Sequence, residues 1–126
     1  MLIDLSKNKL NENLNFDFCV IGAGIAGITL CLHLEKKGYK ILLVESGEFE
    51  HDESTQALYQ GQIKNDLPSI PLDASRLRFF GGTSNHWTGH CGFFDEEDFK
   101  YRSTIKYSGW PFSKKDLINY YIAANN

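Results

Sequence analysis

The pattern of apolar and polar positions predicts a strand, a helix and a second strand in the first part of the chain. Residues 16–21 form a short apolar run that ends at a glycine, which is typical of a buried parallel strand. From Gly24 to Lys37 the apolar residues recur at helical spacing, and Gly38 stands where a glycine commonly ends a helix. Residues 39–44 form a second apolar run. The order strand, helix, strand predicts a βαβ unit with a right-handed crossover, and therefore an α/β fold.

The pattern is less regular after this unit. A short helix is expected over residues 54–62 with Ser54 as its cap, and residues 67–72 should be extended or turning because they contain two prolines. Residues 81–92 are rich in glycine and predict a loop, whereas Ser113 and the carboxylate three residues later predict a helix over 114–124. A doubly wound sheet needs more strands than this pattern supplies, so we expect only part of such a domain.

A glycine-rich turn joins the first strand to the helix. The segment reads Val20-Ile21-Gly22-Ala23-Gly24-Ile25-Ala26-Gly27, and Glu45 follows at the end of the second strand. Gly22 permits a tight turn, Gly24 lets a pyrophosphate approach the backbone, and Gly27 lets the helix pack on its strand. Glu45 is placed to accept the ribose hydroxyls of an adenosine, and its charge disfavours a 2′-phosphate. The motif predicts a dinucleotide site but does not separate FAD from NAD.

Composition and charge argue against nucleic-acid and membrane partners and indicate a cellular compartment. The formal net charge is −3, which gives no electrostatic basis for binding nucleic acid or an anionic membrane. No apolar run approaches the roughly 20 residues that span a bilayer, and the first residues lack the basic-then-apolar order of a secretion signal. The three cysteines are odd in number and widely spaced, which favours reduced thiols. We therefore expect a cytoplasmic protein with no membrane-spanning segment.

A second glycine-rich segment carries a resemblance to a known family. It reads Arg78-Phe79-Phe80-Gly81-Gly82-Thr83-Ser84-Asn85-His86-Trp87. Together with the first turn, with Leu43-Val44-Glu45-Ser46-Gly47 and with Ser108-Gly109-Trp110-Pro111, it resembles the glucose–methanol–choline (GMC) oxidoreductases, in particular a bacterial sugar- and polyol-oxidising branch. The resemblance covers nearly all of this chain but only the N-terminal part of a family member. It implies residues 1–13 as an extension and residues 14–126 as the first segment of a Rossmann-like FAD-binding domain, without the substrate domain of a two-domain flavoprotein.

The resemblance also implies a cofactor, a reaction and a set of site residues. Family members use FAD to oxidise an alcohol or sugar to a carbonyl by hydride transfer to the flavin. The site residues it implies in the second segment lie along the pyrophosphate and ring: Arg78, Gly81, Gly82, Thr83, Ser84 and Asn85. Adjacent glycines and hydroxyl groups suit that contact. The family's catalytic histidine near the C-terminus has no counterpart here, so no catalytic residue is assigned.

His86 has two readings that the sequence leaves open. In pyranose and choline oxidases a histidine at the corresponding place is bonded covalently to the flavin, and the spacing in this chain matches. The other reading is a histidine that only forms hydrogen bonds near the ring.

Other arrangements of chemical groups carry weaker signals. His86, His90 and Cys91 match no zinc-ligand spacing, so no metal is predicted. The acidic run 95–98 is expected to be a solvated turn. Two alternatives to a flavin oxidoreductase segment remain: a nicotinamide-dependent βαβ protein, and a binding module that holds nucleotide without turnover.

Overall fold

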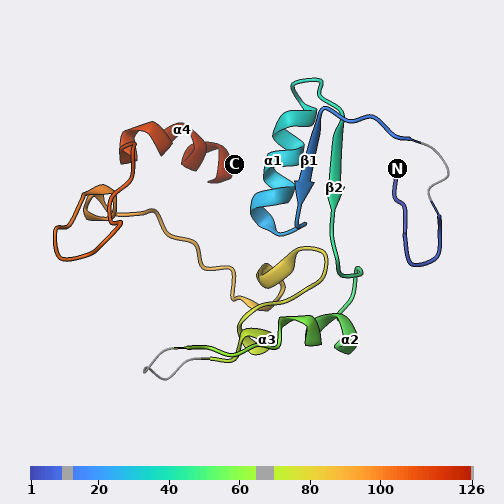
Figure 1. Ribbon diagram of the computed structural model, residues 1–126. Coiled ribbons are helices and arrows are strands. Elements are labelled where there is room, and N and C mark those ends of the chain that lie inside the picture. The colour runs from blue at the N-terminus through green and yellow to red at the C-terminus, as the bar shows by residue number, and fades with distance from the viewer. Residues whose placement is uncertain (10–12, 65–69, 126) are drawn as a thin grey trace. The chain divides into compact units, whose positions relative to one another are not determined.

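The computed structural model describes residues 1–9, 13–64 and 70–125. The chain divides into two compact units, Met1–Thr88 and Gly89–Asn126, and each is described by itself. The first unit holds the strands and both glycine-rich segments (Figure 1). The second unit contains a short 3₁₀ turn and a terminal helix.

The first unit begins with the βαβ unit that the sequence predicts. Strands β1 (Phe18–Ile21) and β2 (Ile41–Val44) pair in parallel, with Phe18 opposite Ile41 and Ile21 opposite Val44. Helix α1 (Ile25–Glu35) connects them and contacts both strands (Figure 1). Gly38 closes the helix with a φ of 89° and donates its N–H to the Glu35 carbonyl over 2.8 Å. The strand, helix and strand predicted from periodicity are confirmed, although each strand is shorter than its apolar run.

The segment after β2 differs from its prediction. Helix α2 (Glu53–Gln56) is only four residues long, and a 3₁₀ turn, η1 (Ala57–Tyr59), follows it. The expected helix over 54–62 with a Ser54 cap is therefore wrong in its length and its cap. Asp52 is the cap: its Oδ1 accepts the N–H of Thr55 over 2.7 Å. Hydrogen bonds from the Ser54 hydroxyl and from Thr55 lower the pKa of Asp52 to about 2, so the cap is charged at neutral pH.

The proline-containing segment and the second glycine segment each contain a turn of helix. Of the expected extended stretch 67–72, residues 67–69 lie outside the described residues, and α3 (Leu72–Ser75) already begins at Leu72, with Pro71 as its N-cap. The 3₁₀ turn η2 (Gly82–His86) replaces the first part of the expected loop over 81–92. Hydrogen bonds from the Ser84 and Asn85 side chains to carbonyl groups of the same segment hold the turn.

The second unit confirms one prediction and refines another. Helix α4 (Lys114–Asn125) is the predicted terminal helix, and the Ser113 N–H and hydroxyl both donate to Oδ2 of Asp116 over 2.8 Å. The acidic run 95–98 forms the start of the 3₁₀ turn η3 (Glu96–Phe99), where Asp95 and Asp98 form a reciprocal capping box. The acidic residues therefore close a turn of backbone.

Apolar side chains are mostly exposed in the described part of the chain. Among those residues only Ala23 and Phe99 are buried hydrophobics, whereas Ile21 on β1 is 86% exposed and Leu32 on α1 is 53% exposed. The strand pair is joined by its hydrogen-bond ladder and is contacted by α1, with the β2 residues Ile41, Leu42 and Leu43 half-buried. No helix of the described residues combines the length and apolar character needed to cross a membrane.

Candidate functional site

The first glycine turn is built by backbone geometry that only glycine permits. Gly22 has a φ of 100° and donates its N–H to the Val44 carbonyl over 2.7 Å, which ties the turn to the end of β2. A Cβ placed on Gly27 would lie 2.0 Å from the carbonyl oxygen of Gly22. Gly22 thus sets the turn and Gly27 allows α1 to lie against it.

The space over the start of α1 is open. A Cβ placed on Gly22 or Gly24 would meet no heavy atom of the described residues within 4 Å, and Gly24 caps the helix without a side-chain hydrogen bond. The first N–H groups of a helix have no intrahelical acceptor and carry a partial positive charge. The turn therefore presents helix N-terminal N–H groups beside open space, and phosphate binding there stays a prediction.

The second glycine segment contacts the first directly. Gly81 donates its N–H to the Ala23 carbonyl over 2.8 Å, and Gly24 and Gly81 form a parallel bridge. Gly81 and Gly82 both have positive φ, at 90° and 58°, and a Cβ placed on Gly82 would lie 3.4 Å from the Cα of Gly24. The two motifs singled out in the sequence form one surface.

The Glu45 carboxylate binds the backbone of the first turn. Its Oε2 accepts the Ala23 N–H over 2.7 Å, while its Oε1 accepts the N–H groups of Ser46 and Gly47 over 2.8 and 3.0 Å. Partial burial raises the pKa of the Glu45 carboxyl, but the hydrogen bonds from Gly47, Ala23 and Ser46 outweigh it and hold the pKa below its usual range. Glu45 directly follows β2 and has a structural role at the turn that the sequence analysis did not identify, whereas its contact with a ribose stays a prediction.

We expect the substitution Glu45→Gln to lower the unfolding free energy by about 1–2 kcal/mol at pH 7, because the N–H groups of Ala23, Ser46 and Gly47 lose their charged acceptor. The folded-state pKa of Glu45 is depressed, so its contribution is present above the unfolded pKa of roughly 4.3 and disappears as the pH falls through the folded value. Urea unfolding of both proteins across this range measures the difference. A gap that widens toward acid would contradict the assignment.

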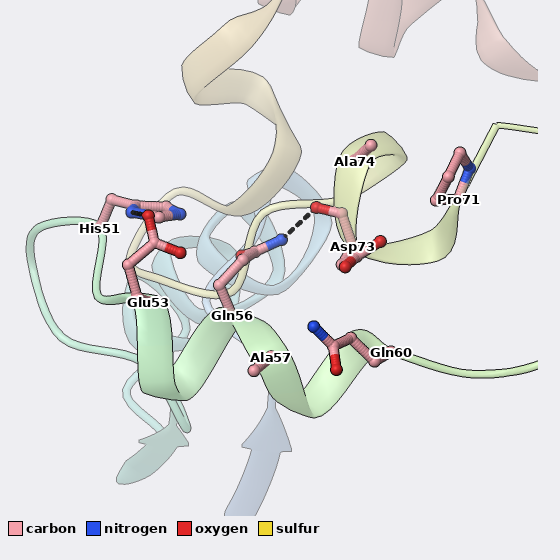
Figure 2. A pocket seen from close by; sticks show the side chains of 8 residues that line it. All are labelled: His51, Glu53, Gln56, Ala57, Gln60, Pro71, Asp73 and Ala74. Carbon is pink, nitrogen blue, oxygen red and sulfur yellow. Dashed lines mark hydrogen bonds and ion pairs between the residues drawn. The ribbon is translucent and has the colours of Figure 1, made fainter.

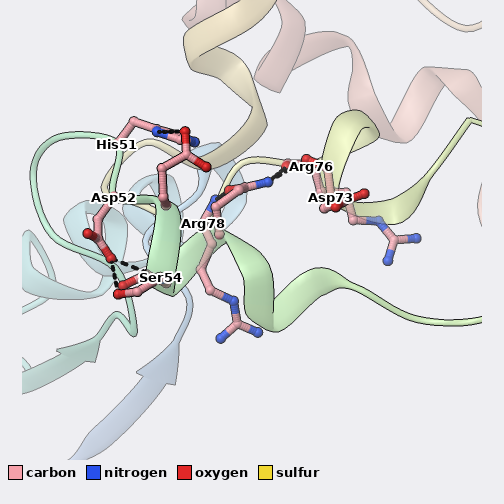
Figure 3. A network of polar contacts seen from close by, with 9 residues as sticks. His51, Asp52, Ser54, Asp73, Arg76 and Arg78 are labelled. Atoms are coloured by element: carbon pink, nitrogen blue, oxygen red, sulfur yellow. Dashed lines mark hydrogen bonds and ion pairs between the residues drawn. The ribbon is translucent and has the colours of Figure 1, made fainter.

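Arg78 turns toward the residue that follows Glu45. One terminal guanidinium nitrogen donates to the Ser46 hydroxyl over 2.9 Å, and the guanidinium lies 4.4 Å from the centre of the Tyr59 ring. Its Nε is buried and has no hydrogen-bond partner among the residues that the structure describes. Figure 3 shows the side chain within a wider polar network. The structure thus joins the second segment to the end of β2 through a contact that the sequence did not indicate.

The polar side chains after Gly82 hold their own loop. The Ser84 hydroxyl donates to the Gly81 carbonyl over 2.7 Å, and the Asn85 amide donates to the carbonyls of Phe80 and Gly82, both over 2.9 Å. The Thr83 hydroxyl oxygen accepts the Leu77 N–H over 3.3 Å. These contacts leave the backbone of Gly81 and Gly82 as the part of the segment nearest the first turn. His86 is exposed at the end of η2.

A separate open pocket of about 320 Å³ lies among α2, η1 and α3 (Figure 2). Its lining includes His51, Glu53, Gln56 and Asp73, and none of the predicted site residues. Across residues 1–9, 13–64 and 70–125, no three or more His, Cys, Asp or Glu side chains gather closely enough to hold a metal ion. The glycine surface is therefore the better candidate for a cofactor site.

Sequence reasoning missed three residues that shape this surface. Ser46 receives Arg78, Gly47 lies against the backbone of Arg78, and Gln56 binds the N–H of Arg78. In the sequence, Ser46 and Gly47 appear only within the segment Leu43-Val44-Glu45-Ser46-Gly47 that carries the family resemblance, with no role assigned to either. Gln56 had no sequence signal.

Comparisons with known proteins agree with the geometry. A family model described as FAD dependent oxidoreductase matches residues 17–100, which contain both glycine segments. Protein FixC of Azorhizobium caulinodans is 36% identical over 61 residues, covering 47% of this chain and 14% of that protein. The 2-methyl-1,2-propanediol dehydrogenase of Mycolicibacterium austroafricanum is 25% identical over 125 residues, covering 83% of this chain and 23% of that protein.

This chain therefore spans less than a quarter of the length of either relative. No solved structure matches it. Since the family match covers both glycine segments and most of the chain, the chain belongs to the FAD dependent oxidoreductase family and uses FAD as its cofactor.

Proposed function

We propose that this chain supplies the FAD-binding segment of an oxidoreductase of the GMC type, which oxidises the CH–OH group of a small alcohol, polyol or sugar to a carbonyl. The observation that carries the proposal is the bridge between Gly24 and Gly81, which unites the two glycine segments in one surface. The relative named as a propanediol dehydrogenase supports an alcohol substrate.

When bound, FAD would supply the acceptor for the hydride of the alcohol carbon. The start of α1 and the open face of Gly24 would hold the pyrophosphate, with Glu45 beside the adenosine ribose. The backbone of Gly81 and Gly82 would contact the flavin end. None of the described residues is assigned as the base that takes the hydroxyl proton.

Specificity for FAD over nicotinamide nucleotides follows from the second segment. A βαβ unit with its glycine turn and acid suits either dinucleotide. The additional backbone edge of Gly81 and Gly82, held against the turn by the 2.8 Å bond from Gly81 to Ala23, offers further contact to the larger flavin end. Glu45 also disfavours the 2′-phosphate of NADP by charge repulsion.

Titration of the purified protein tests the proposal. We expect FAD to bind at least about tenfold more tightly than NAD or NADP, as followed by quenching of flavin fluorescence and by competition. In the oxidoreductase of which this chain is proposed to be the FAD-binding segment, anaerobic addition of a diol or sugar should bleach the flavin absorption band. Tighter binding of NAD than of FAD would contradict the proposal.

The same loaded protein distinguishes the two readings of His86. Flavin that stays with the acid-precipitated protein, and that is released in a His86→Ala variant, would establish a covalent bond. Complete release from the unsubstituted protein would leave His86 as a residue near the ring only.

A further inference from the structure

Gln56, at the end of α2, is a buried polar side chain among neighbours that are half-buried or exposed. It is 7% exposed and is the one buried polar residue among those described. A buried amide must satisfy its hydrogen-bonding groups or lose free energy. Its hydrogen-bond partners therefore identify the backbone segment that Gln56 stabilises.

The Gln56 amide uses both its donors and its acceptor on one distant segment. Nε2 donates to the carbonyl oxygens of Asp73 and Arg76, each over 2.6 Å, and Oε1 accepts the N–H of Arg78 over 3.0 Å. Figure 2 shows the bond to Asp73, and Figure 3 shows the surrounding network. One side chain thus joins α2 to the segment that leads into the second glycine motif.

The third bond fixes the point where that motif approaches the first turn. Arg78 is held by its N–H at Gln56, while its guanidinium reaches Ser46 and its carbonyl lies over Gly47. Two residues later, Phe80 donates its N–H to the Glu48 carbonyl over 2.9 Å, and Gly81 then binds Ala23. The course of this backbone decides how Gly81 and Gly82 face the open space above Gly24.

We propose that Gln56 is a positioning residue: it sets the path of residues 76–82 and thereby the placement of the Gly81-Gly82 backbone toward FAD. Its effect on FAD affinity rests on the proposed function, whereas its effect on the backbone does not. Glutamine is the suitable residue because the site presents two carbonyl acceptors and one N–H donor. Leucine removes all three bonds, and glutamate keeps the acceptor but turns a carboxylate toward two carbonyl oxygens.

The test compares Gln56→Leu and Gln56→Glu with the control variant Gln60→Leu. Gln60 is an exposed glutamine about one turn further along the chain. Hydrogen exchange of the FAD-free protein should show the Arg78 amide exchanging at least about tenfold faster in Gln56→Leu, because its acceptor is gone. Gln56→Glu should keep part of this protection through its remaining oxygen. The Gly22 amide, bound to Val44, should exchange at an unchanged rate in all three variants.

FAD titration supplies the second readout. We expect Gln56→Leu to bind FAD about tenfold more weakly than the unsubstituted protein, which corresponds to one lost net interaction, and Gln60→Leu to bind it equally well. Unchanged exchange at Arg78 in Gln56→Leu would overturn the positioning role. Loss of protection at Gly22 as well would also overturn it, since Gln56 would then act on the fold as a whole.

The two proposals fail separately. If the unsubstituted protein binds no FAD, the proposed function fails, and exchange at Arg78 still decides the role of Gln56. If the unsubstituted protein binds FAD and Gln56→Leu binds it equally, the proposed function stands and the positioning role is rejected.

Discussion

Substitution of Gly27 by alanine should abolish FAD binding and strongly destabilise the βαβ unit. The added Cβ would lie 2.0 Å from the Gly22 carbonyl oxygen and 3.2 Å from its carbon, and both atoms belong to the backbone. Relief requires α1 to move off the turn, which breaks the 2.7 Å bond from Gly22 to Val44. We expect a loss of at least about 3 kcal/mol in unfolding free energy, measured by urea denaturation followed by circular dichroism.

Gly24→Ala is the matched control for Gly27→Ala, because a Cβ at Gly24 meets no heavy atom within 4 Å and the φ of −77° suits alanine. The unfolding free energy should change by less than about 1 kcal/mol. FAD affinity should nevertheless fall about 100-fold, since the methyl group occupies the space through which the pyrophosphate approaches. Equal FAD binding by Gly24→Ala and the unsubstituted protein would show that the pyrophosphate lies elsewhere.

Substitution of Gly47 by alanine should displace the second glycine segment while the βαβ unit remains folded. The added Cβ would lie 2.1 Å from the Arg78 carbonyl oxygen and 2.6 Å from both the Arg78 carbonyl carbon and the Phe79 Cα. Because all three contacts are backbone, residues 78–80 must move as a unit, and the bonds from Phe80 to Glu48 and from Arg78 to Ser46 are lost. We expect FAD to bind about 100-fold more weakly, which corresponds to about 2.7 kcal/mol.

Hydrogen exchange separates this effect from general unfolding. The Phe80 and Gly81 amides should lose protection in Gly47→Ala, whereas the Gly22 amide should keep it. Gly61→Ala is the control, since its Cβ would meet only a Leu72 methyl at 3.5 Å, an ordinary contact. Retained protection at Phe80 in Gly47→Ala would mean that the segment accommodates the methyl group and that Gly47 is not required.

Residues that signal their structure locally were predicted well. The first strand, α1, β2 and α4 followed from periodicity and from caps, because these depend on neighbours within a few residues. The tight turn predicted at Gly22 and the close packing predicted at Gly27 are also confirmed, since a strand-to-helix turn requires them by its own geometry. Where two neighbouring residues can cap the same helix, the prediction was wrong: Asp52 caps α2 in place of Ser54 because its carboxylate accepts the Thr55 N–H.

The sequence by itself therefore determined the βαβ unit, the glycine turn at its head and the presence of a second glycine segment. Only the tertiary structure decided that Gly81 pairs with Gly24, that Oε2 of Glu45 accepts the Ala23 N–H, and that Gln56 binds the Arg78 N–H. These contacts join residues that are far apart in the chain, so no local spacing records them. They form because buried backbone N–H and C=O groups need partners, and the fold determines which partners are within reach.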